Sequence, residues 1–364
     1  MLTRRRFLTT SVTACGLLGL QACSGETDYA EAVARIWRHS ATTLDDAAAR
    51  TLELVRYATL APSSHNTQCW KFRPGGDGIS ILPDFDRRCP VVDPDDHHLF
   101  VSLGCAAENL IQAAAAFGQH GEARFVSAAG GSVDIALTPA TAQRSPLFEA
   151  IPNRQTTRGD FDGQPLDREE LGLLAQAGRG EGVQLLLLTE RQAMEAMLEL
   201  VIQGNTAQMR DPAFIRELKT WIRFGEAEAV ALGDGLFARS SGNPALPRWL
   251  GSRMFDLFFS EQVENDKYAR QVRNSAGIAV FVSAVNDAAH WMAVGRAFER
   301  FALQATALGV RTAHLNQPVE LPGLRAQVSD YLGLKPGRPD LVIRFGRGAE
   351  MPRALRRPVA AVIA

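Results

Sequence analysis

Residues 60–72 read LAPSSHNTQCWKF, and six consecutive polar residues fill positions 63–68 of this stretch. Hydroxyl, imidazole and amide groups at this density could do chemistry in two ways. A serine beside a histidine could act as a nucleophile with its base, or the whole loop could bind a ligand. Sequence neighbours rarely have the geometry of a catalytic triad, and the chain contains no G-x-S-x-G motif. Ligand binding is therefore favoured, and a serine hydrolase remains only as a contrasting hypothesis.

A second polar group lies at residues 153–158, which read NRQTTR. Arg154 and Arg158 are four residues apart with the hydroxyl of Thr156 between them, so a helical turn here would bring all three to one anion. Arginine forks match phosphate oxygens bidentately. The chain from Arg344 onward adds five arginines against one acidic residue. These residues fit either a phosphate site or a basic surface that meets a membrane, and composition does not separate the two.

Residues 93–98 read DPDDHH and contain the ligand types of a metal site. No other histidine or cysteine cluster lies at ligand spacing, so we expect a solvated turn before a helix and no metal. No G-x-G-x-x-G motif follows a predicted strand, and no Walker loop is present. The sequence therefore does not predict a Rossmann or P-loop nucleotide site.

The composition is that of ordinary globular protein. The 364 residues are 46% hydrophobic and 22% charged, which is typical of one large domain or two smaller ones. The net charge is −1, so no nucleic acid is expected and a small-molecule partner is favoured. Cys69, Cys89 and Cys105 follow the N-terminal segment, and their odd number and scattered spacing predict buried thiols rather than a disulfide framework or a zinc site.

Residues 1–23 have the pattern of an export signal. An arginine run at positions 4–6 precedes an apolar stretch at 8–22, which is shorter than the roughly 20 residues of a spanning helix. The arginine pair and the Phe-Leu that follows it resemble a twin-arginine signal, and the Leu-x-Ala-Cys ending resembles a lipoprotein cleavage box. We expect export by the twin-arginine route, with the protein periplasmic or membrane-anchored through a lipid on Cys23.

Two segments of the chain resemble each other. Residues 104–118 read GCAAENLIQAAAAFG, and residues 295–309 read GRAFERFALQATALG. Both predict helices, and each precedes a predicted strand. Chance similarity between alanine-rich helices is the alternative, but the matched glycines, glutamates and following strands favour an internal duplication. The predicted strands lie at residues 78–82, 123–128, 183–188, 278–282, 310–315 and 341–345.

The second half of the chain contains an insertion. Residues 193–266 are largely helical and have no counterpart in the first half. They could extend the scaffold, or they could form a lid over a site. Both interpretations remain open.

Two of these motifs together resemble those of FMN-dependent nitroreductases. Residues 61–70, APSSHNTQCW, resemble the A-P-S-x-x-N-x-Q-P-W loop of that family, and residues 154–158 resemble its R-x-[ST]-x-R phosphate motif. Leu-Asn-Gln-Pro-Val-Glu at 315–320 and Arg-Arg-Pro at 356–358 resemble motifs of the Acg-type, twin-arginine-exported branch. Cys69 stands where the family has proline, and no role can be assigned to it from the sequence.

The resemblance implies an α+β, nitroreductase-like fold. Family members are usually homodimers with FMN between the subunits, so this chain would be two tandem degenerate halves that form an intrachain pseudo-dimer and act as a monomer. We expect the halves at residues 24–145 and 146–364, with the insertion at about 193–266 as a candidate lid. One ancestral site would have decayed, since residues 38–42 lack the second arginine and residues 177–180 lack the polar side chains.

The function that the resemblance implies is reduction of nitro compounds or quinones by hydride transfer through bound FMN. NADPH or NADH would be a transient electron donor, and no side chain need be catalytic because the flavin carries the hydride. The alternative is a flavin-binding or flavin-sequestering protein with a lid-covered site and no turnover. The expected cofactor-binding residues are Pro62, Ser63, Ser64, Asn66, Gln68, Arg154, Thr156, Arg158 and Arg356.

Overall fold

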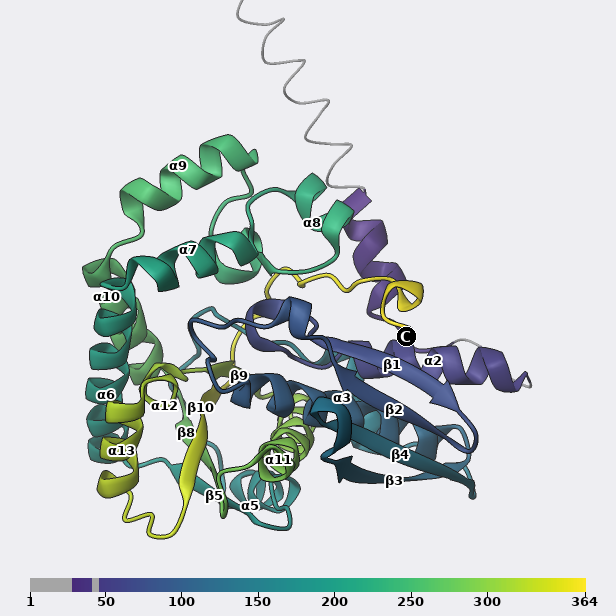
Figure 1. The fold of residues 1–364 in the computed structure, drawn as a ribbon. Helices are drawn as coiled ribbons and strands as arrows, with labels where there is room; N and C mark the ends of the chain where they lie inside the picture. Colours follow the sequence, from purple (N-terminus) through teal and green to yellow (C-terminus); the bar gives the residue numbers. More distant parts are fainter. Residues whose placement is uncertain (1–27, 41–45) are drawn as a thin grey trace, which may run out of the picture.

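The computed structural model describes residues 28–40 and 46–364, and it has the α+β architecture that we predicted (Figure 1). The predicted signal segment, including Cys23, lies outside the described residues. Two long helices, α3 (His97–Ala116) and α11 (Ala288–Ala307), lie side by side between two β-sheets. α3 packs against the first sheet, and α11 packs against the second.

The two sheets are antiparallel and share one strand order. The first sheet has the order β1-β2-β4-β3, and the second has the order β5-β8-β10-β9. A helix precedes the first strand of each sheet, α2 (Ala47–Thr59) in one case and α5 (Arg168–Ala177) in the other. The strands are β1 (Trp70–Gly75), β2 (Gly78–Pro83), β3 (Gln119–Val126) and β4 (Ser132–Pro139), then β5 (Val183–Leu188), β8 (Gly277–Ser283), β9 (Arg311–His314) and β10 (Arg338–Gly346).

All six predicted strands overlap strands of the structure, and β1 and β4 of the two four-stranded sheets are not among them. The second sheet is covered on both faces, which explains why every residue of β8 and β10 is buried. Alternate residues of β8 face different layers: Ile278 and Val280 pack with the insertion, whereas Ala279 and Phe281 pack with α11. Such strands become continuous apolar runs, which are easy to recognise in a sequence.

α3 and α11 approach each other through two glycines in a reciprocal arrangement. A Cβ atom on Gly104 would lie 2.1 Å from the carbonyl oxygen of Met292, and one on Gly295 would lie 2.0 Å from that of Val101. Each glycine therefore faces the residue three positions before the other glycine. The two helix backbones are in direct contact, and no side chain fits between them. Gly104 and Gly295, which make this contact, are the first residues of the two repeated segments.

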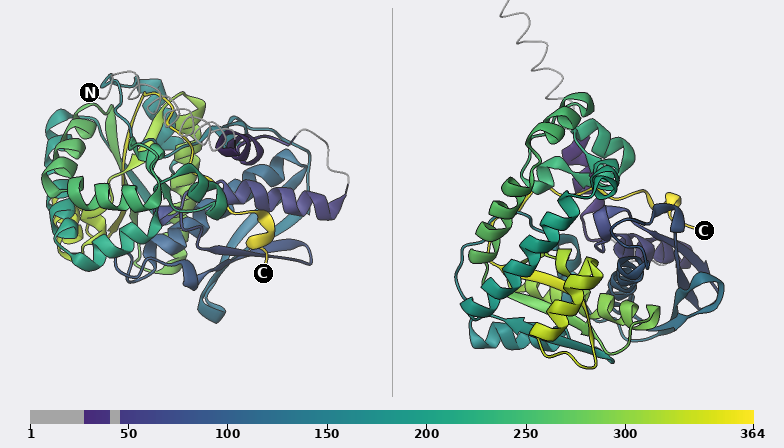
Figure 2. Two further views of the ribbon diagram at one scale, coloured as in Figure 1. Left: turned by 90° about the horizontal axis from the view of Figure 1, so that it is seen from above. Right: turned by 60° about the vertical axis from the view of Figure 1, so that its left-hand side comes forward.

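The predicted insertion forms five helices between β5 and β8. α6 packs on the outer face of the second sheet. The other four helices of the insertion extend from there across one end of the molecule (Figure 2). Residues 28–36, which are helical, pack beside α8, where Tyr29 and Ala229 share a small apolar cluster with Phe237. The elements are α6 (Arg191–Met209), α7 (Pro212–Trp221), β6 (Ile222–Arg223), α8 (Glu226–Leu232), β7 (Leu236–Phe237), α9 (Arg248–Phe258) and α10 (Glu261–Arg273).

Short elements complete the fold. α4 (Pro146–Ala150) precedes the predicted phosphate motif, and α12 (Gln317–Glu320) and α13 (Pro322–Tyr331) connect β9 to β10. Among the described residues, α3 is long and apolar enough to cross a membrane by length and composition, but 78% of its apolar window is buried inside the fold. α3 is therefore a core helix.

Gly295→Ala should destabilise the protein by about 1–3 kcal/mol, because its Cβ would collide with the Val101 carbonyl. The matched control is Gly172→Ala in the interior of α5, where a Cβ meets nothing within 4 Å. Higher helix propensity should make that variant equally or slightly more stable. Urea unfolding midpoints measure both effects, and equal midpoints for the two variants would contradict the close helix contact.

Candidate functional site

A small cavity of about 70 Å³ lies where segments far apart in the sequence meet. Its walls come from the loop after α2, the 154–158 segment, the insertion and the C-terminal segment, together with Trp37 and His314. Of the predicted binding residues, Ser64 and Gln68 do not line the cavity. The structure brings the other seven together: Pro62, Ser63, Asn66, Arg154, Thr156, Arg158 and Arg356.

The loop after α2 has an unusual backbone. Residues other than glycine rarely adopt positive φ, yet His65, Asn66 and Gln68 have φ values of 47°, 53° and 55°. The N–H of Gln68 donates to Ser63 Oγ at 2.9 Å, which ties the two ends of the turn together. Backbone strain of this kind is concentrated at functional sites. The loop is thus held in one particular conformation beside the cavity.

Asn66 and Gln68 also hold a segment of the insertion. Asn66 Nδ2 donates to the Gly235 carbonyl at 2.9 Å, and the Gly235 N–H donates back to the Asn66 carbonyl at 3.1 Å. Gln68 Nε2 donates to the Gly233 carbonyl at 2.8 Å. We call residues 233–241 the covering loop. Asn66 and Gln68, which we predicted to bind a ligand, therefore use some of their hydrogen-bonding groups to hold the covering loop.

Charged contacts fasten the covering loop as well. The Asp234 carboxylate lies 2.7 Å from Arg223 Nη2 and also pairs with Arg87, which comes from the first half of the chain. The loop continues to Leu236 and Ser240, which line the cavity. The insertion therefore contributes one wall of the site.

Residues 154–158 are extended, so the predicted helical turn is wrong. Thr156 forms a parallel bridge with Thr312 on the edge strand β9, and the Thr157 N–H donates to the Thr312 carbonyl at 2.9 Å. In an extended chain, residues two and four apart point to the same side. Arg154, Thr156 and Arg158 therefore still converge, and pairing with β9 aligns them.

Arg154 is 2% exposed and has one acidic neighbour. Its Nε lies 3.3 Å from Glu299 Oε1 on α11, and its Nη2 donates to the Leu60 carbonyl at 3.1 Å. Within the described residues, its Nε and Nη1 make no hydrogen bond. Burial raises the pKa of Glu299 to about 7, so the carboxylate only partly balances the guanidinium charge at neutral pH. Arg154 keeps donors available for a ligand.

Arg356 has the opposite character, because all its N–H groups are used. Nε and Nη2 donate to the carbonyls of residues 59–61 at the end of α2, and Nη1 donates to Asn66 Oδ1 and the Leu355 carbonyl. Burial lowers the pKa of Arg356 to about 9. Arg356 therefore fixes the end of α2 and the loop, and it offers charge rather than a free donor to the cavity.

The Arg158 guanidinium has no hydrogen-bond or ion-pair partner in the part of the chain that the structure describes. Its contact to Gln271 is made by its backbone carbonyl, which accepts from Nε2 at 2.6 Å. Burial lowers the pKa of Arg158. A guanidinium that is partly removed from water without a counterion is an anion-binding candidate.

The cavity as a whole is positively charged. Four arginines and no carboxylate line it: Arg154, Arg158, Arg353 and Arg356. Burial and then the Arg158 charge lower the pKa of His314 to about 3 and that of His65 to about 4, so both are neutral near pH 7. The site fits an anion. At about 70 Å³ it is smaller than the roughly 300–1,000 Å³ of sites for larger ligands, so a group attached to the anion requires the covering loop to move.

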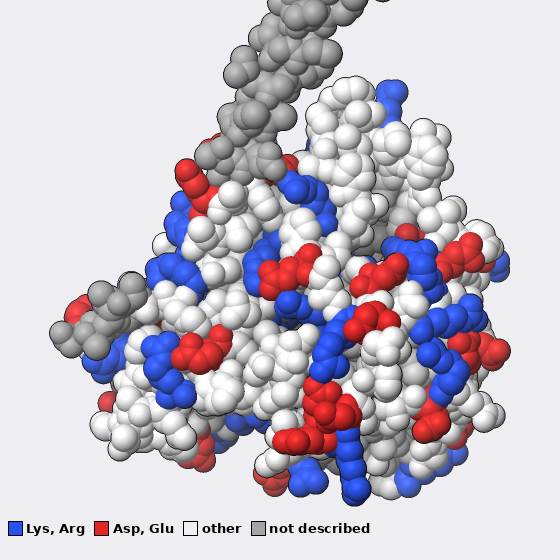
Figure 3. Space-filling model, turned by 180° about the vertical axis from the view of Figure 1, so that it is seen from behind, with Lys and Arg blue, Asp and Glu red and all other residues white. Residues whose placement is uncertain are grey.

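Two of the five C-terminal arginines are buried and the other three are partly exposed, so together they do not form an open basic surface. Arg344 is 1% exposed and Arg356 is 7% exposed. Arg347 pairs with Glu170, and Arg353 donates to the Pro152 carbonyl at 2.8 Å. Figure 3 shows acidic and basic side chains interspersed on the face seen from behind.

Two residues of the site escaped the sequence analysis. Glu299, beside Arg154, is one of the glutamates matched between the repeated helices, so the repeat contained a signal for it. His314 lies within the predicted strand 310–315 and carried no signal. Only the pairing of β9 with the 154–158 segment places it in the wall.

Residues 93–98 form the predicted turn before a helix, with Pro94 and Asp95 exposed, but three of its side chains are not solvated. Asp93, His97 and His98 are 3%, 2% and 5% exposed. The Asp93 carboxylate accepts the N–H groups of His98 at 2.9 Å and Leu99 at 3.0 Å, in the first turn of α3. The free N–H groups at the start of a helix need such an acceptor, and the Asp93 side chain is buried because it provides one. These residues border a different cavity.

The three cysteines after the N-terminal segment are free and buried, as predicted. Burial raises the pKa of Cys69 to about 12, so its thiol is protonated near neutral pH. Cys69 is therefore a core thiol and not a nucleophile.

Comparison with known proteins finds similar sequences among mycobacterial proteins. No protein-family model matches the chain. A provisionally named NAD(P)H nitroreductase of Mycobacterium tuberculosis, in strains CDC 1551 and H37Rv, is 24% identical over 321 residues. The match covers 85% of this chain and 90% of the relative.

Solved structures give weaker similarity. An FMN-dependent nitroreductase of Mycobacterium smegmatis in complex with NADPH has a TM-score of 0.40 at 13% identity, covering 59% of this chain and 96% of that one. A Bacteroides fragilis nitroreductase with bound FMN has a TM-score of 0.34 at 16% identity, covering 56% and 89%. At these scores the likeness carries no argument about the site.

His314→Gln should reduce the loss of stability in acid. Burial lowers the pKa of His314 in the folded state to about 3, below its ordinary value of 6.5. The unfolded chain therefore binds a proton at this residue more readily than the folded protein does. The stability that His314 contributes is complete above pH 6.5 and is lost as the pH falls. The parent should lose about 1–2 kcal/mol between pH 7 and pH 5 through this residue, and the variant should not. Urea unfolding at both pH values measures the difference. The exposed His120→Gln variant is the control, and a parent-like loss in His314→Gln would contradict the assignment.

Proposed function

We propose that the chain is an FMN-dependent oxidoreductase of nitroreductase type and that the cavity holds the phosphate of FMN. The observation that carries the proposal is the charge of the cavity, which four arginines and no carboxylate line. Arg154 and Arg158 both keep guanidinium donors without partners among the described residues. The similar mycobacterial proteins, provisionally named NAD(P)H nitroreductases, support the same function.

Each predicted residue has a role in this proposal. Arg154, Thr156 and Arg158 bind the phosphate, and Arg356 adds positive charge while it fixes the loop. Pro62, Ser63 and Asn66, which also line the cavity, contact the remainder of the cofactor. Ser64 and Gln68 do not line the cavity. Gln68 supports the loop, because its side chain hydrogen-bonds to the Gly233 carbonyl and to the Arg357 N–H.

Bound FMN would supply the hydride chemistry, between NADPH or NADH and an acceptor such as a nitro compound or quinone. The chain contributes binding and electrostatics. Fixed donors and cations in a site shielded from water stabilise negative charge more strongly than they would in solution. The proposal needs no side chain as general acid or base.

We also propose that the two halves, residues 24–145 and 146–364, form an intrachain pseudo-dimer, so that the chain acts as a monomer. The identical strand orders of the two sheets support this. The reciprocal contact of Gly104 and Gly295 supports it too, because a two-fold relation between the halves requires the same contact twice.

The second ancestral site has decayed in this proposal. Glu108 on α3 is the counterpart of Glu299, and it lies 2.8 Å from Arg300 Nη1 and 3.1 Å from Arg296 Nε. Arg300 also donates to the carbonyls of Ala177 and Arg179 in the loop after α5, as Arg154 and Arg356 donate to carbonyls after α2. Arginines of α11 thus neutralise the glutamate where a second site would lie.

Export is a further part of the proposal. The arginine run at 4–6, the short apolar stretch and Cys23 support a twin-arginine signal with a lipoprotein-type ending. Together with the 315–320 and 356–358 motifs, they favour the Acg-type branch and a periplasmic or lipid-anchored location.

The alternative is a protein that sequesters flavin under the covering loop without turnover. The bonds from Asn66 and Gln68 to residues 233–235 favour it, as does the small volume of the cavity. The insertion would then be a lid rather than a scaffold extension.

Arg158→Ala should weaken FMN binding about 10- to 150-fold, since a charge-assisted hydrogen bond contributes about 1.5–3 kcal/mol. Titration of FMN fluorescence against the apoprotein measures the dissociation constant. Arg253→Ala, at an exposed position of α9, is the matched control and should bind FMN as the parent does. Unchanged affinity in Arg158→Ala would contradict the phosphate assignment.

Asp234→Asn should accelerate reduction of the bound flavin several-fold if the covering loop limits access, because the variant loses the ion pairs to Arg87 and Arg223. Stopped-flow mixing with NADPH, followed by flavin bleaching, measures the rate. Asp256→Asn is the matched control, since it removes an exposed ion pair to Lys219 within the same insertion. No bleaching in any of these proteins would contradict the enzyme and favour the sequestering protein.

A further inference from the structure

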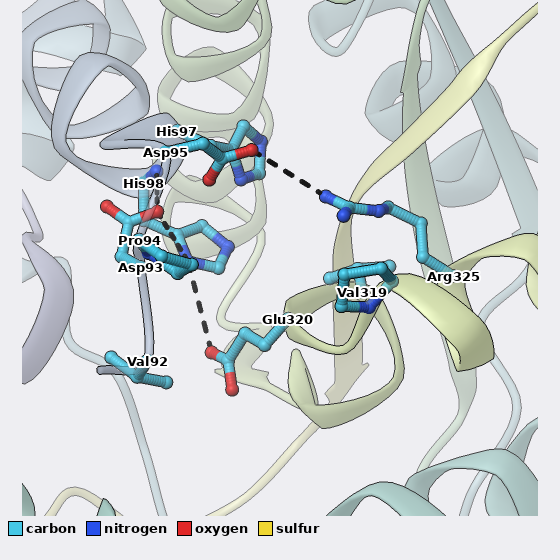
Figure 4. Close-up of a pocket in the computed structure, with 10 residues that line it drawn as sticks. Val92, Asp93, Pro94, Asp95, His97, His98, Val319, Glu320 and Arg325 are labelled. Carbon is cyan, nitrogen blue, oxygen red and sulfur yellow. Dashed lines mark hydrogen bonds and ion pairs between the residues drawn. The ribbon is translucent and has the colours of Figure 1, made fainter. Parts of the chain in front are cut away.

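We propose a divalent-metal site between residues 93–98 and residues 315–320, with Asp93, His98 and Glu320 as its protein ligands. Neither segment has a role in the proposed flavin site. A second cavity of about 270 Å³ lies between them, and all three ligands line it (Figure 4). None of them lines the arginine-lined cavity.

A carboxylate lies on each side of the His98 imidazole. His98 Nδ1 lies 3.9 Å from Asp93 Oδ1 and 3.9 Å from Glu320 Oε1, beyond hydrogen-bond distance to both (Figure 4). His98 is only 5% exposed, so this nitrogen faces the carboxylates in a largely buried setting. A tetrahedral ion with bonds of about 2.1 Å places its ligand atoms about 3.4 Å apart. To bind one ion, both carboxylates would have to move about half an ångström toward His98 Nδ1 and also approach each other.

Surrounding contacts already orient the ligands. Gln208 Nε2 donates to Glu320 Oε2 at 2.5 Å, leaving Oε1 toward His98. The backbone N–H groups at the start of α3 hold the Asp93 carboxylate. Support of this kind is typical of ligands at metal sites.

The arginines nearest to these two carboxylates form their ion pairs with other acidic residues. Asp340 pairs with Arg338 at 2.5 Å, and Asp95 pairs with Arg338 at 3.2 Å and with Arg325 at 4.0 Å. In the described part of the chain, His98 is the only ion-pair partner of Asp93 and Glu320. Two carboxylates and one imidazole match one divalent ion.

The donor set indicates the class of metal. One imidazole and two carboxylates suit Zn²⁺ or Mn²⁺ rather than an ion that prefers thiolates. His97 also lines the cavity, with a ligand atom within 4.8 Å of those of Asp93 and His98, and its Nε2 lies 2.9 Å from Asp340 Oδ1. A water would complete the coordination. Asp93 and His98 precede or begin α3, whereas Glu320 ends α12 beyond β9. The ion would link segments that belong to different sheets, and its binding would stabilise the fold.

Metal uptake by the tag-free full-length protein tests the proposal. After dialysis against a chelator, isothermal titration with Zn²⁺ should give one ion per chain, and Zn²⁺ should raise the thermal unfolding temperature by several degrees. Co²⁺ in place of Zn²⁺ should give visible d–d absorption without thiolate-to-metal charge transfer. No uptake, or a thiolate signal from the buried cysteines, would overturn the site.

Variants assign the ligands. Glu320→Gln and His98→Gln should each lower the Zn²⁺ affinity at least tenfold, with circular dichroism used to verify folding. His290→Gln is the matched control, because His290 forms an exposed pair with Asp287 (2.7 Å) and should leave Zn²⁺ binding unchanged. Loss of binding in His290→Gln, with retention in Glu320→Gln, would overturn the proposal. The Co²⁺ spectrum of the parent protein keeps the test decisive if a variant does not fold.

Discussion

The backbone contact between α3 and α11 is the constraint on which the rest of the structure depends. Because Gly104 and Gly295 each face a carbonyl of the other helix, the two helices can lie together only in this register. Each helix carries its own sheet, so the contact also fixes the sheets relative to each other. The same geometry sets Glu299 beside Arg154 at one end and Glu108 beside Arg300 at the other.

These two buried glutamates show how similar arrangements can differ in function. Two arginines of α11 accompany Glu108 and form ion pairs with it. Glu299 has a pKa of about 7 and stands beside a cavity whose lining carries four arginines. Charge that the protein itself does not balance is costly to bury. The phosphate of the proposed cofactor would bring negative charge to this end, and this links the fold to the proposed function.

The sequence predicts the parts of this structure that rest on local patterns. Apolar runs locate β8 and β10, and the two motifs identify most residues of the cavity. The backbone at residues 154–158 was predicted wrongly because its conformation depends on pairing with β9, which is distant in the chain. Asp93 and His98 were expected to be exposed because the contacts that bury them are not visible in the sequence. The Asp93 carboxylate accepts an N–H group at the start of α3, and His98 lies near Glu320, which is distant in the chain. The sequence predicts Gln68 as a ligand-binding residue because it does not reveal the hydrogen bond from Gln68 to the covering loop.

The central claim is that one end of a pseudo-symmetric helix pair binds one FMN and the other end binds none. The most direct measurement is the ratio of flavin to protein after loading with FMN and removal of the excess, from the flavin absorbance near 450 nm (a general property of flavins) and the protein concentration. The account predicts a ratio near one. A ratio near two would contradict the decay of the second site, and a colourless protein that takes up no FMN would contradict the cofactor itself.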